Sequence, residues 1–129
     1  MIPKYRAWHK TKKIMSEVKK INFWSEELDA VAFAEKHFED VKLMQSTGLF
    51  DKNGKEIFEG DIVTDGEFAR IVQYHQTLGF YMFDEEGNER FFSDSATLED
   101  FEEDAKIVSE ILEIIGNVYE NPELLEVTE

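Results

Sequence analysis

The stretch of sequence that decides the fold runs from residue 43 to residue 63 and reads LMQSTGLFDKNGKEIFEGDIV. Two apolar segments flank Asp51-Lys52-Asn53-Gly54, and an Asn-Gly pair accepts the positive φ angles that a tight hairpin turn requires. Gly60 interrupts the second apolar segment, which indicates a bulge or a bend where another backbone passes closely. The stretch therefore predicts a β-hairpin with Asn53 and Gly54 at its tip, followed by a bent strand.

The residues before this hairpin predict another one. Residues 4 to 9 and residues 13 to 23 mix aromatic, apolar and charged side chains at a period of two, with a polar turn between them. Residues 25 to 38 allow two interpretations, because Ser25 can cap a helix while Val31 to Ala34 can also form a strand. We expect a short helix there.

The residues after the central stretch continue as short strands. Turn signals at Asp65-Gly66, Gly79 and Gly87 separate these strands at a spacing of about ten residues, which is typical of a small barrel or sandwich. The sequence thus predicts a mainly β fold, a small barrel or sandwich of antiparallel hairpins with one or two short helices. We expect a single domain covering residues 1 to 129.

Residues 97 to 115 allow both a helix and a strand. The apolar side chains that fit one helix face are Leu98, Phe101, Ala105, Val108, Ile111, Leu112 and Ile115. A β-branched cluster in the same region competes as a strand. We predict a helix over residues 97 to 105 and a strand over residues 110 to 119, with Pro122 after its end.

Composition and charge exclude several classes of protein. The chain has no Cys, which excludes disulfides, thiolate zinc sites and a cysteine nucleophile, and its short apolar runs predict no membrane span and no secretory signal. The net charge of −15 is unevenly distributed: residues 1 to 64 carry 11 basic and 11 acidic side chains, and residues 65 to 129 carry 3 and 18. We expect a protein of the cytoplasm.

Candidates for catalysis are few. Glu59 and Asp61 lie on the same face of a regular strand and are the one carboxylate pair worth testing, although a bulge at Gly60 would make them structural. His9 and the other two histidines are too far apart in sequence for a metal-ligand pattern. The sequence contains no phosphate loop and no dinucleotide fingerprint. We expect neither a cofactor nor an enzyme.

Two charged surfaces are candidates for binding. The acidic residues that would meet a protein partner are Asp84, Glu85, Glu86, Glu99, Asp100, Glu102, Glu103 and Asp104. The residues that would meet nucleic acid are Arg6, Trp8, Lys10, Lys12, Lys13, Lys19 and Lys20, with Trp8 as a stacking platform. Aromatic residues at a period of two, including Phe23 and Trp24, more often form the core side of a hairpin, and the charge of −15 repels nucleic acid.

Three blocks of the sequence occur together in one known family. They are Tyr5-Arg6-Ala7-Trp8, the central stretch from residue 43 to residue 63, and the closing IGNVYENPELL from residue 115 to residue 125. In this order they resemble the YopX family, and they bracket nearly the whole chain. The departures are His9, where the family usually has Asp, Ser46, where an aromatic residue is usual, and a longer segment from Asp94 to Glu110.

The resemblance implies a small β-rich protein encoded by bacteriophages and prophages, with no established activity, cofactor or catalytic residue. The matched blocks coincide with predicted turns and bends, which favours a scaffold role for the motif. We therefore expect a non-catalytic accessory protein that binds a host or phage protein in the bacterial cytoplasm, with homo-oligomerisation left open. A nucleic-acid-binding module that uses the basic N-terminal hairpin is the alternative, and an enzyme is the third.

Overall fold

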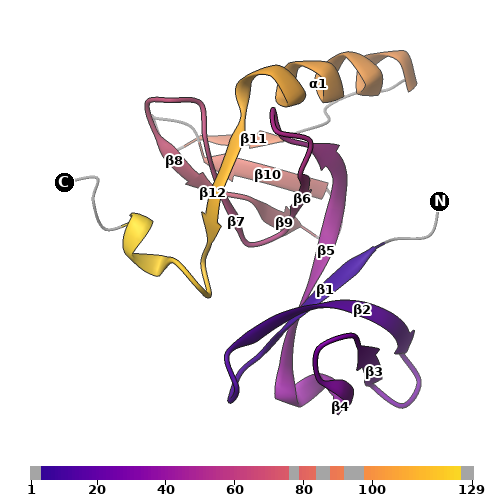
Figure 1. Cartoon of the computed structure of the whole chain (residues 1–129). Helices are drawn as coiled ribbons and strands as arrows, with labels where there is room; N and C mark the ends of the chain where they lie inside the picture. Colours follow the sequence, from indigo (N-terminus) through magenta and orange to yellow (C-terminus); the bar gives the residue numbers. More distant parts are fainter. Residues whose placement is uncertain (1–3, 76–78, 84–87, 92–97, 126–129) are drawn as a thin grey trace. The chain divides into compact units, whose positions relative to one another are not determined.

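The structure, a computed structural model, describes residues 4–75, 79–83, 88–91 and 98–125. Most of these residues form short β-strands (Figure 1). The strands are β1 (Tyr5–His9), β2 (Ile14–Asn22), β3 (Glu27–Ala30), β4 (Ala34–His37), β5 (Val41–Phe50), β6 (Glu56–Phe58), β7 (Asp61–Thr64), β8 (Ala69–Ile71), β9 (Gln73–His75), β10 (Gly79–Phe83), β11 (Glu89–Phe91) and β12 (Glu113–Asn117). The helical elements are η1 (Phe38–Asp40), α1 (Leu98–Ile111) and η2 (Pro122–Leu125). None of these helices is long and apolar enough to cross a membrane.

The strands form antiparallel sheets built from hairpins. One sheet has the order β4-β3-β2-β1-β5-β6, and the other two have the orders β11-β10-β9 and β12-β7-β8. Over the described residues these sheets do not close into a barrel, so the sandwich-like arrangement of hairpins is the predicted architecture that fits. The prediction of a mainly β fold with antiparallel hairpins is confirmed.

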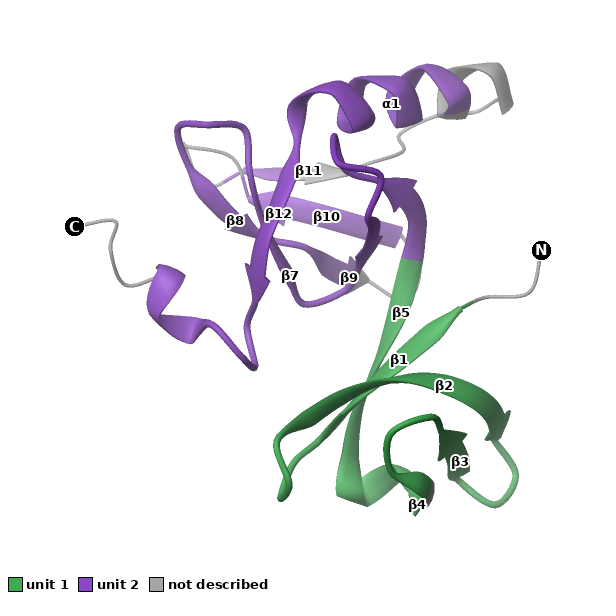
Figure 2. Ribbon diagram, in the orientation of Figure 1, with its two compact units in different colours: residues 1–46 green, residues 47–129 purple. Residues whose placement is uncertain are grey.

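The chain divides into two compact units, residues 1–46 and residues 47–129 (Figure 2). Each unit has its own cluster of buried apolar side chains. In unit 1 the cluster consists of Ala7, Leu28, Ala30, Phe33 and Val41, and in unit 2 of Leu49, Ile57, Val63, Val72, Val108 and Leu112. The boundary between the units falls within β5. The prediction of a single domain stays a prediction.

Unit 1 begins with the predicted N-terminal hairpin. β1 pairs antiparallel with β2, from Arg6 opposite Glu17 to His9 opposite Ile14, and β1 pairs on its other side with β5. Alternation explains the burial in β3, where Leu28 and Ala30 are buried and their neighbours are half-buried.

The short helix expected over residues 25 to 38 is wrong, because this segment forms β3, β4 and η1. The reason lies outside the segment. β2 supplies hydrogen-bond acceptors to this segment, and a local helix would not make these contacts. Val31 N donates to Glu17 O over 3.1 Å, and Ala32 N donates to Ser16 Oγ over 2.8 Å. Ser25, which we expected to cap a helix, lies in the turn between β2 and β3.

Unit 2 begins with the hairpin that the central stretch predicted. Gly54 has a φ of 79° at the turn between β5 and β6, Gly54 N donates to Asp51 O over 3.0 Å, and Asp51 N donates to Lys55 O over 2.8 Å. Gly60 has a φ of 89° between β6 and β7. The backbone that passes close to this bend is that of Val118, whose N–H donates to Gly60 O over 2.9 Å. The hairpin, the positive φ of Gly54 and the bend at Gly60 are confirmed, but the two central residues of the turn are Lys52 and Asn53 rather than the predicted Asn53 and Gly54.

The helix near the C-terminus is longer than predicted. α1 extends to Ile111 rather than ending at residue 105, and β12 spans five residues rather than the ten expected. Val108 and Leu112 are 8% and 7% exposed and join the apolar cluster of unit 2, so burial of this face outweighs the β-branched preference of the segment.

Candidate functional site

The uneven charge of the sequence follows the division into units. Unit 1 contains nine Lys or Arg and seven Asp or Glu, a formal charge of +2. Unit 2 contains five Lys or Arg and 22 Asp or Glu, a formal charge of −17. The electrostatic field that a partner meets is therefore strongly negative at unit 2 and weak at unit 1.

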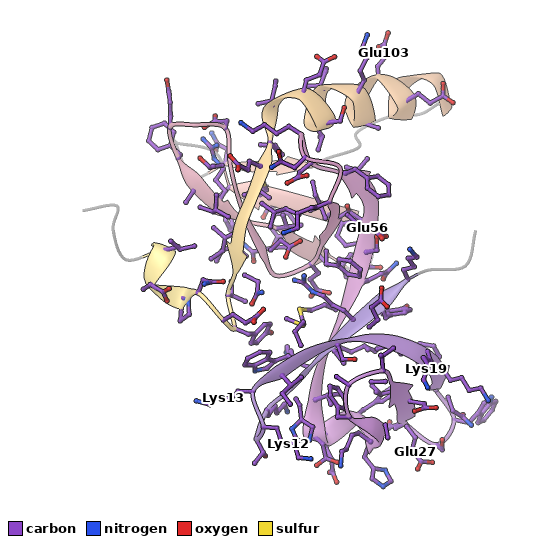
Figure 3. The ribbon with its side chains drawn as sticks, viewed as in Figure 1. Lys12, Lys13, Lys19, Glu27, Glu56 and Glu103 are labelled. Carbon is purple, nitrogen blue, oxygen red and sulfur yellow. The ribbon has the colours of Figure 1, made fainter. Side chains whose placement is uncertain are left out.

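The predicted acidic surface is only partly within the described structure. Asp84, Glu85 and Glu86 lie outside the described residues, and Glu99 and Asp100 are placed on α1 by their backbone. Glu102 and Glu103 are exposed, and Asp104 is half-buried. In Figure 3 Glu103 lies on the side of α1 that points away from the strands. Of the residues predicted to form the acidic surface, those that the structure describes all lie on α1.

Two apolar side chains share this outward side of α1. Ile107 is 52% exposed and Ile111 is 49% exposed, whereas Val108 and Leu112, each one residue further along, are buried. Residues four apart on a helix lie above one another, so Glu103, Ile107 and Ile111 form one row. We call the exposed residues Glu102, Glu103, Lys106, Ile107, Glu110 and Ile111 the α1 outer face.

Sequence reasoning listed Ile111 among the side chains that fit one helix face and predicted a strand from residue 110, whereas Ile111 ends α1 and is 49% exposed. The two rows lie about 100° apart around the helix, and Ile111 is only three residues from Val108, so Ile111 lies at the border of the buried side. A helical projection places Ile111 about 60° from Val108, so it does not by itself show that Ile111 is exposed.

The predicted nucleic-acid surface is divided between the two ends of β2. Lys10, Lys12 and Lys13 are exposed in the turn before β2, and Lys19 and Lys20 are exposed near its other end (Figure 3). Arg6 is half-buried on β1. At about 3.3 Å per residue the two lysine groups are roughly 20 Å apart along the strand. Trp8 is only 8% exposed, so the predicted stacking platform is wrong, since base stacking needs an open ring face.

A different tryptophan is exposed on unit 1. Trp24 is 100% exposed between β2 and β3, and Phe23 is 62% exposed beside it. Asn22 holds the backbone of this turn, because its Oδ1 accepts hydrogen bonds from Trp24 N over 2.9 Å and from Ser25 N over 3.2 Å. We call residues 22–26 the β2–β3 tip. Sequence reasoning missed Trp24 because a period of two suggested the core, although Asn22 is a turn signal.

An open groove of about 500 Å³ lies beside this tip. Its lining residues are Lys20, Ile21, Asn22, Ser25, Glu27, Leu28 and Asp29, all within unit 1. Ile21 is half-buried and Leu28 is only 2% exposed, so the groove offers little apolar surface, while Lys20, Glu27 and Asp29 supply charged groups. We call this feature the tip groove.

The carboxylate pair proposed for catalysis is built into a bend. Asp61 is 2% exposed, and its Oδ2 accepts a hydrogen bond from Phe58 N over 2.8 Å, which closes the β6–β7 turn around Gly60. Glu59 is half-buried in the same turn. Asp61 therefore has the structural role that a bulge at this position implied.

His9 and His37 lie in separate environments. His9 is 6% exposed, and its Nδ1 accepts a hydrogen bond from Lys12 N over 3.1 Å. His37 is exposed on β4. Among the residues that the structure describes, no three His, Asp or Glu side chains are grouped so that they could hold a metal ion.

The central block of the sequence motif acts as a scaffold. Asp51 is 2% exposed, and its Oδ1 accepts hydrogen bonds from Asn53 N and Lys55 N, each over 2.9 Å. Its Oδ2 accepts one from Ile114 N over 2.9 Å. Burial alone would raise the pKa of Asp51, but these three backbone donors and the charge of Lys55 hold it below its usual range.

The closing block is a second scaffold. Asn117 Oδ1 accepts hydrogen bonds from Tyr119 N over 3.0 Å and Glu120 N over 2.9 Å, and Asn117 N donates to Asn121 Oδ1 over 3.2 Å. A Cβ atom on Gly116 would lie 2.6 Å from Asn121 Oδ1, so the close approach needs glycine. These contacts hold the turn after β12.

Comparisons with known proteins agree with the fold and with the sequence motif. A family profile described as YopX protein matches residues 4–126. The crystal structure of protein EF1440 from Enterococcus faecalis matches with a TM-score of 0.66 and 28% sequence identity, covering 97% of this chain and 99% of that chain. A search of curated proteins gave no match. Because the profile spans nearly the whole chain, the resemblance is confirmed and the protein belongs to the YopX family.

Proposed function

We propose that this YopX-family chain is a phage- or prophage-encoded accessory protein that binds another protein without catalysis. It acts in the cytoplasm of the bacterial host, on a host or phage protein. The single observation that carries the proposal is the exposure of Ile107 and Ile111 on the α1 outer face, beside the carboxylates of that face. Contiguous apolar side chains that stay exposed on a folded chain are a common mark of a docking surface.

The chemistry of the surface supports a basic, amphipathic partner segment. Ile107 and Ile111 would contact its apolar side, in the manner of a helix that lies on a complementary face. Glu103 and Glu110 flank this apolar pair and would face its cations, while Lys106 is the one basic residue within the α1 outer face. The charge of −17 on unit 2 would accelerate the approach of such a partner.

Affinity purification from infected host cells tests the proposal, with the full chain as bait. The double variant Ile107→Ser/Ile111→Ser should capture at least about tenfold less partner, because two buried aliphatic contacts are lost. Val31→Ser is the matched control, since Val31 is 62% exposed on unit 1. Capture of nothing above background at low and physiological salt, or capture that the double variant retains in full, would contradict the proposal.

The alternative is a nucleic-acid-binding module based on the turn before β2. The observation that favours it is the exposure of Lys10, Lys12 and Lys13 within one four-residue turn. Binding through these lysines would fall steeply with salt, because counterions are released from the phosphates. Fluorescence polarisation with single- and double-stranded oligonucleotides tests it, and an absence of binding at ~50 mM salt would eliminate it.

A further inference from the structure

We propose that Asn53 is a site of spontaneous deamidation that the native turn between β5 and β6 holds unreactive, so that the modification marks chains in which this turn has opened. The modification concerns the hairpin alone and does not rest on the proposed function. Three features support it: a reactive dipeptide, the hydrogen bonds that block its reaction, and the contacts that the product would lose.

Asn53 is the one asparagine of the chain that a glycine follows. The other four are Asn22, Asn88, Asn117 and Asn121, which precede Phe, Glu, Val and Pro. In deamidation the backbone nitrogen of the next residue attacks the side-chain carbonyl carbon, and a glycine there has no Cβ that obstructs the approach. Asn53 and Gly54 are both exposed, and the space beside Gly54 is open, so water has access to the site.

The reaction needs no reagent other than water. Gly54 N gives up its proton and bonds to Asn53 Cγ, the Cγ–Nδ2 bond breaks, and Nδ2 takes up a proton and leaves as ammonia. The product is a succinimide ring. Water then opens this ring at either carbonyl. Cleavage of the bond between nitrogen and Cγ gives aspartate, and cleavage of the bond between nitrogen and the main-chain carbonyl carbon gives isoaspartate.

The native turn blocks the first step because it engages the attacking nitrogen. Gly54 N donates a hydrogen bond to Asp51 O over 3.0 Å, so its proton is held. This bond, together with an Asn53 that does not have a positive φ, is that of a type I turn, in which Asn53 has a ψ of about 0°. At this angle Gly54 N lies on the side of Asn53 N, and it must rotate toward Asn53 Cβ before a ring can close. That rotation breaks the hydrogen bond to Asp51.

The side chain of Asp51 fixes the peptide groups on both sides of the reactive one. Its Oδ1 accepts hydrogen bonds from Asn53 N and Lys55 N, each over 2.9 Å. Asp51 is 2% exposed and also holds Ile114 N, so it is not free to follow the rotation. Deamidation therefore requires local opening of the turn. Its rate in the folded protein is the rate in an open chain multiplied by the small fraction of open turns.

The product cannot restore all contacts of the native turn. Asn53 Nδ2 donates to Glu113 Oε2 over 3.5 Å, and deamidation replaces this donor with a carboxylate that repels Glu113. Isoaspartate in addition routes the backbone through Cβ, which displaces Gly54 relative to Asp51. Because Asp51 also holds Ile114, the modification should loosen the start of β12.

Incubation of the full chain in buffer and in guanidinium chloride, followed by peptide mass spectrometry, tests the proposal. In the denaturant Asn53 should deamidate faster than the other four asparagines, and faster as the pH rises, because the deprotonated nitrogen attacks. In buffer the rate at Asn53 should be at least about tenfold lower than in the denaturant. Digestion in heavy-oxygen water labels any ring that opens during sample preparation and corrects for that background.

Variants test the role of Asp51. In buffer, folded Asp51→Ala should deamidate at Asn53 at least about fivefold faster than the wild type, because the lost hydrogen bonds make opening easier. The matched control Glu103→Ala removes an exposed acid and should react as the wild type does. In guanidinium chloride all three chains should react at the same rate, since no turn is left to protect Asn53.

Hydrogen exchange on the wild type gives a second measurement, which holds even if Asp51→Ala does not fold. Opening of the turn frees the same N–H of Gly54 that must lose its proton in the reaction. As guanidinium chloride is raised below the unfolding transition, exchange at Gly54 and deamidation at Asn53 should therefore accelerate in parallel.

The effect of the product is measured on modified chains that are refolded in buffer and separated by anion exchange. They should unfold several degrees below the wild type, with Asn53→Asp between the two, because this variant carries the new charge without the longer backbone. A modified chain with the wild-type Tm would show that the turn accepts the product.

Four further results would overturn the proposal. A rate at Asn53 that is equal in buffer and in denaturant would show that the turn gives no protection. A rate in denaturant no higher than at the other asparagines would remove the site. Folded Asp51→Ala that reacts as slowly as the wild type, or deamidation that does not follow exchange at Gly54, would show that the hydrogen bonds of Asp51 do not control the reaction.

Discussion

Asp51 Oδ2 accepts a hydrogen bond from Ile114 N over 2.9 Å, across 63 residues of sequence. The same carboxylate holds the turn between β5 and β6 through Asn53 N and Lys55 N. One buried side chain therefore fixes the hairpin turn and attaches it to the start of β12. Asp51 of the central motif therefore links two segments of unit 2 that are far apart in the sequence.

Replacement of Asp51 should destabilise the protein more than replacement of any exposed acid. Asp51→Ala leaves three backbone N–H groups without their acceptor, so we expect a loss of about 2–4 kcal/mol in the free energy of unfolding. Asp51→Asn should lose less, because one amide oxygen still accepts. Urea denaturation measures both, with Glu103→Ala as the exposed control. Equal stability of Asp51→Ala and the control would refute the structural role.

The depressed pKa of Asp51 predicts acid sensitivity. The usual value is 3.8, and the folded value lies below it, so this group stabilises the fold above about pH 4. The contribution is lost as the pH falls through the folded pKa, because the unfolded state binds the proton more tightly. Asp65 follows the same sign, since hydrogen bonds from Glu67 N and Phe68 N lower its pKa.

Free energies of unfolding between about pH 7 and pH 3 measure this effect. The wild type should lose stability steadily below about pH 4, and Asp51→Asn should show a shallower slope, because it has one linked carboxyl fewer. A slope that Asp51→Asn leaves unchanged would assign the acid sensitivity to other groups.

Gly54 should be sensitive to substitution for its backbone alone. Its φ is 79°, and no atom lies within 4 Å of the position that a Cβ would occupy. Gly54→Val should therefore lower the Tm by about 3–8 °C through the strained φ, while partner binding by the folded protein stays intact. Gly54→Asn should cost less, because Asn tolerates this conformation. If Gly54→Val kept its Tm but lost partner binding, the turn would be a recognition loop.

His9 combines two roles that substitutions can separate. Its Nδ1 accepts from Lys12 N, and its ring packs edge-on against Phe33 with a centroid distance of 5.1 Å. His9→Phe keeps the ring and His9→Asn keeps a short acceptor, so each should cost about 1 kcal/mol and His9→Ala about the sum. Thermal unfolding measures the series. A His9→Ala cost no larger than that of His9→Phe would show that the ring contact contributes nothing.

The sequence predicted the features whose causes are local. The Asn53-Gly54 turn, the bend at Gly60 and the N-terminal hairpin all follow from glycine conformations and from alternation, which a few neighbouring residues determine. His9, where the resemblance led us to expect Asp, accepts a hydrogen bond from Lys12 N in the turn after β1.

The errors arose where distant residues decide the outcome. Residues 25 to 38 became strands because β2 supplies Ser16 and Glu17 as hydrogen-bond acceptors, which no local pattern in that segment reveals. The burial of Trp8 depends likewise on which side of a hairpin meets the core, and Trp24 is exposed in the turn between β2 and β3. Charge counting found the acidic α1, but it could not show that Ile107 and Ile111 lie exposed among the acids.

The order of the strands along the chain has a consequence for synthesis on the ribosome. β1 to β4 and the first part of β5 all lie in the first 46 residues, so unit 1 can pair as soon as it has emerged. β7 begins at Asp61, but its partner β12 begins at Glu113, about 50 residues and roughly 3–10 seconds later. Until α1 and β12 emerge, Ile57 and Val63 lack their final cover. The nascent chain in that interval is therefore a natural client for chaperones.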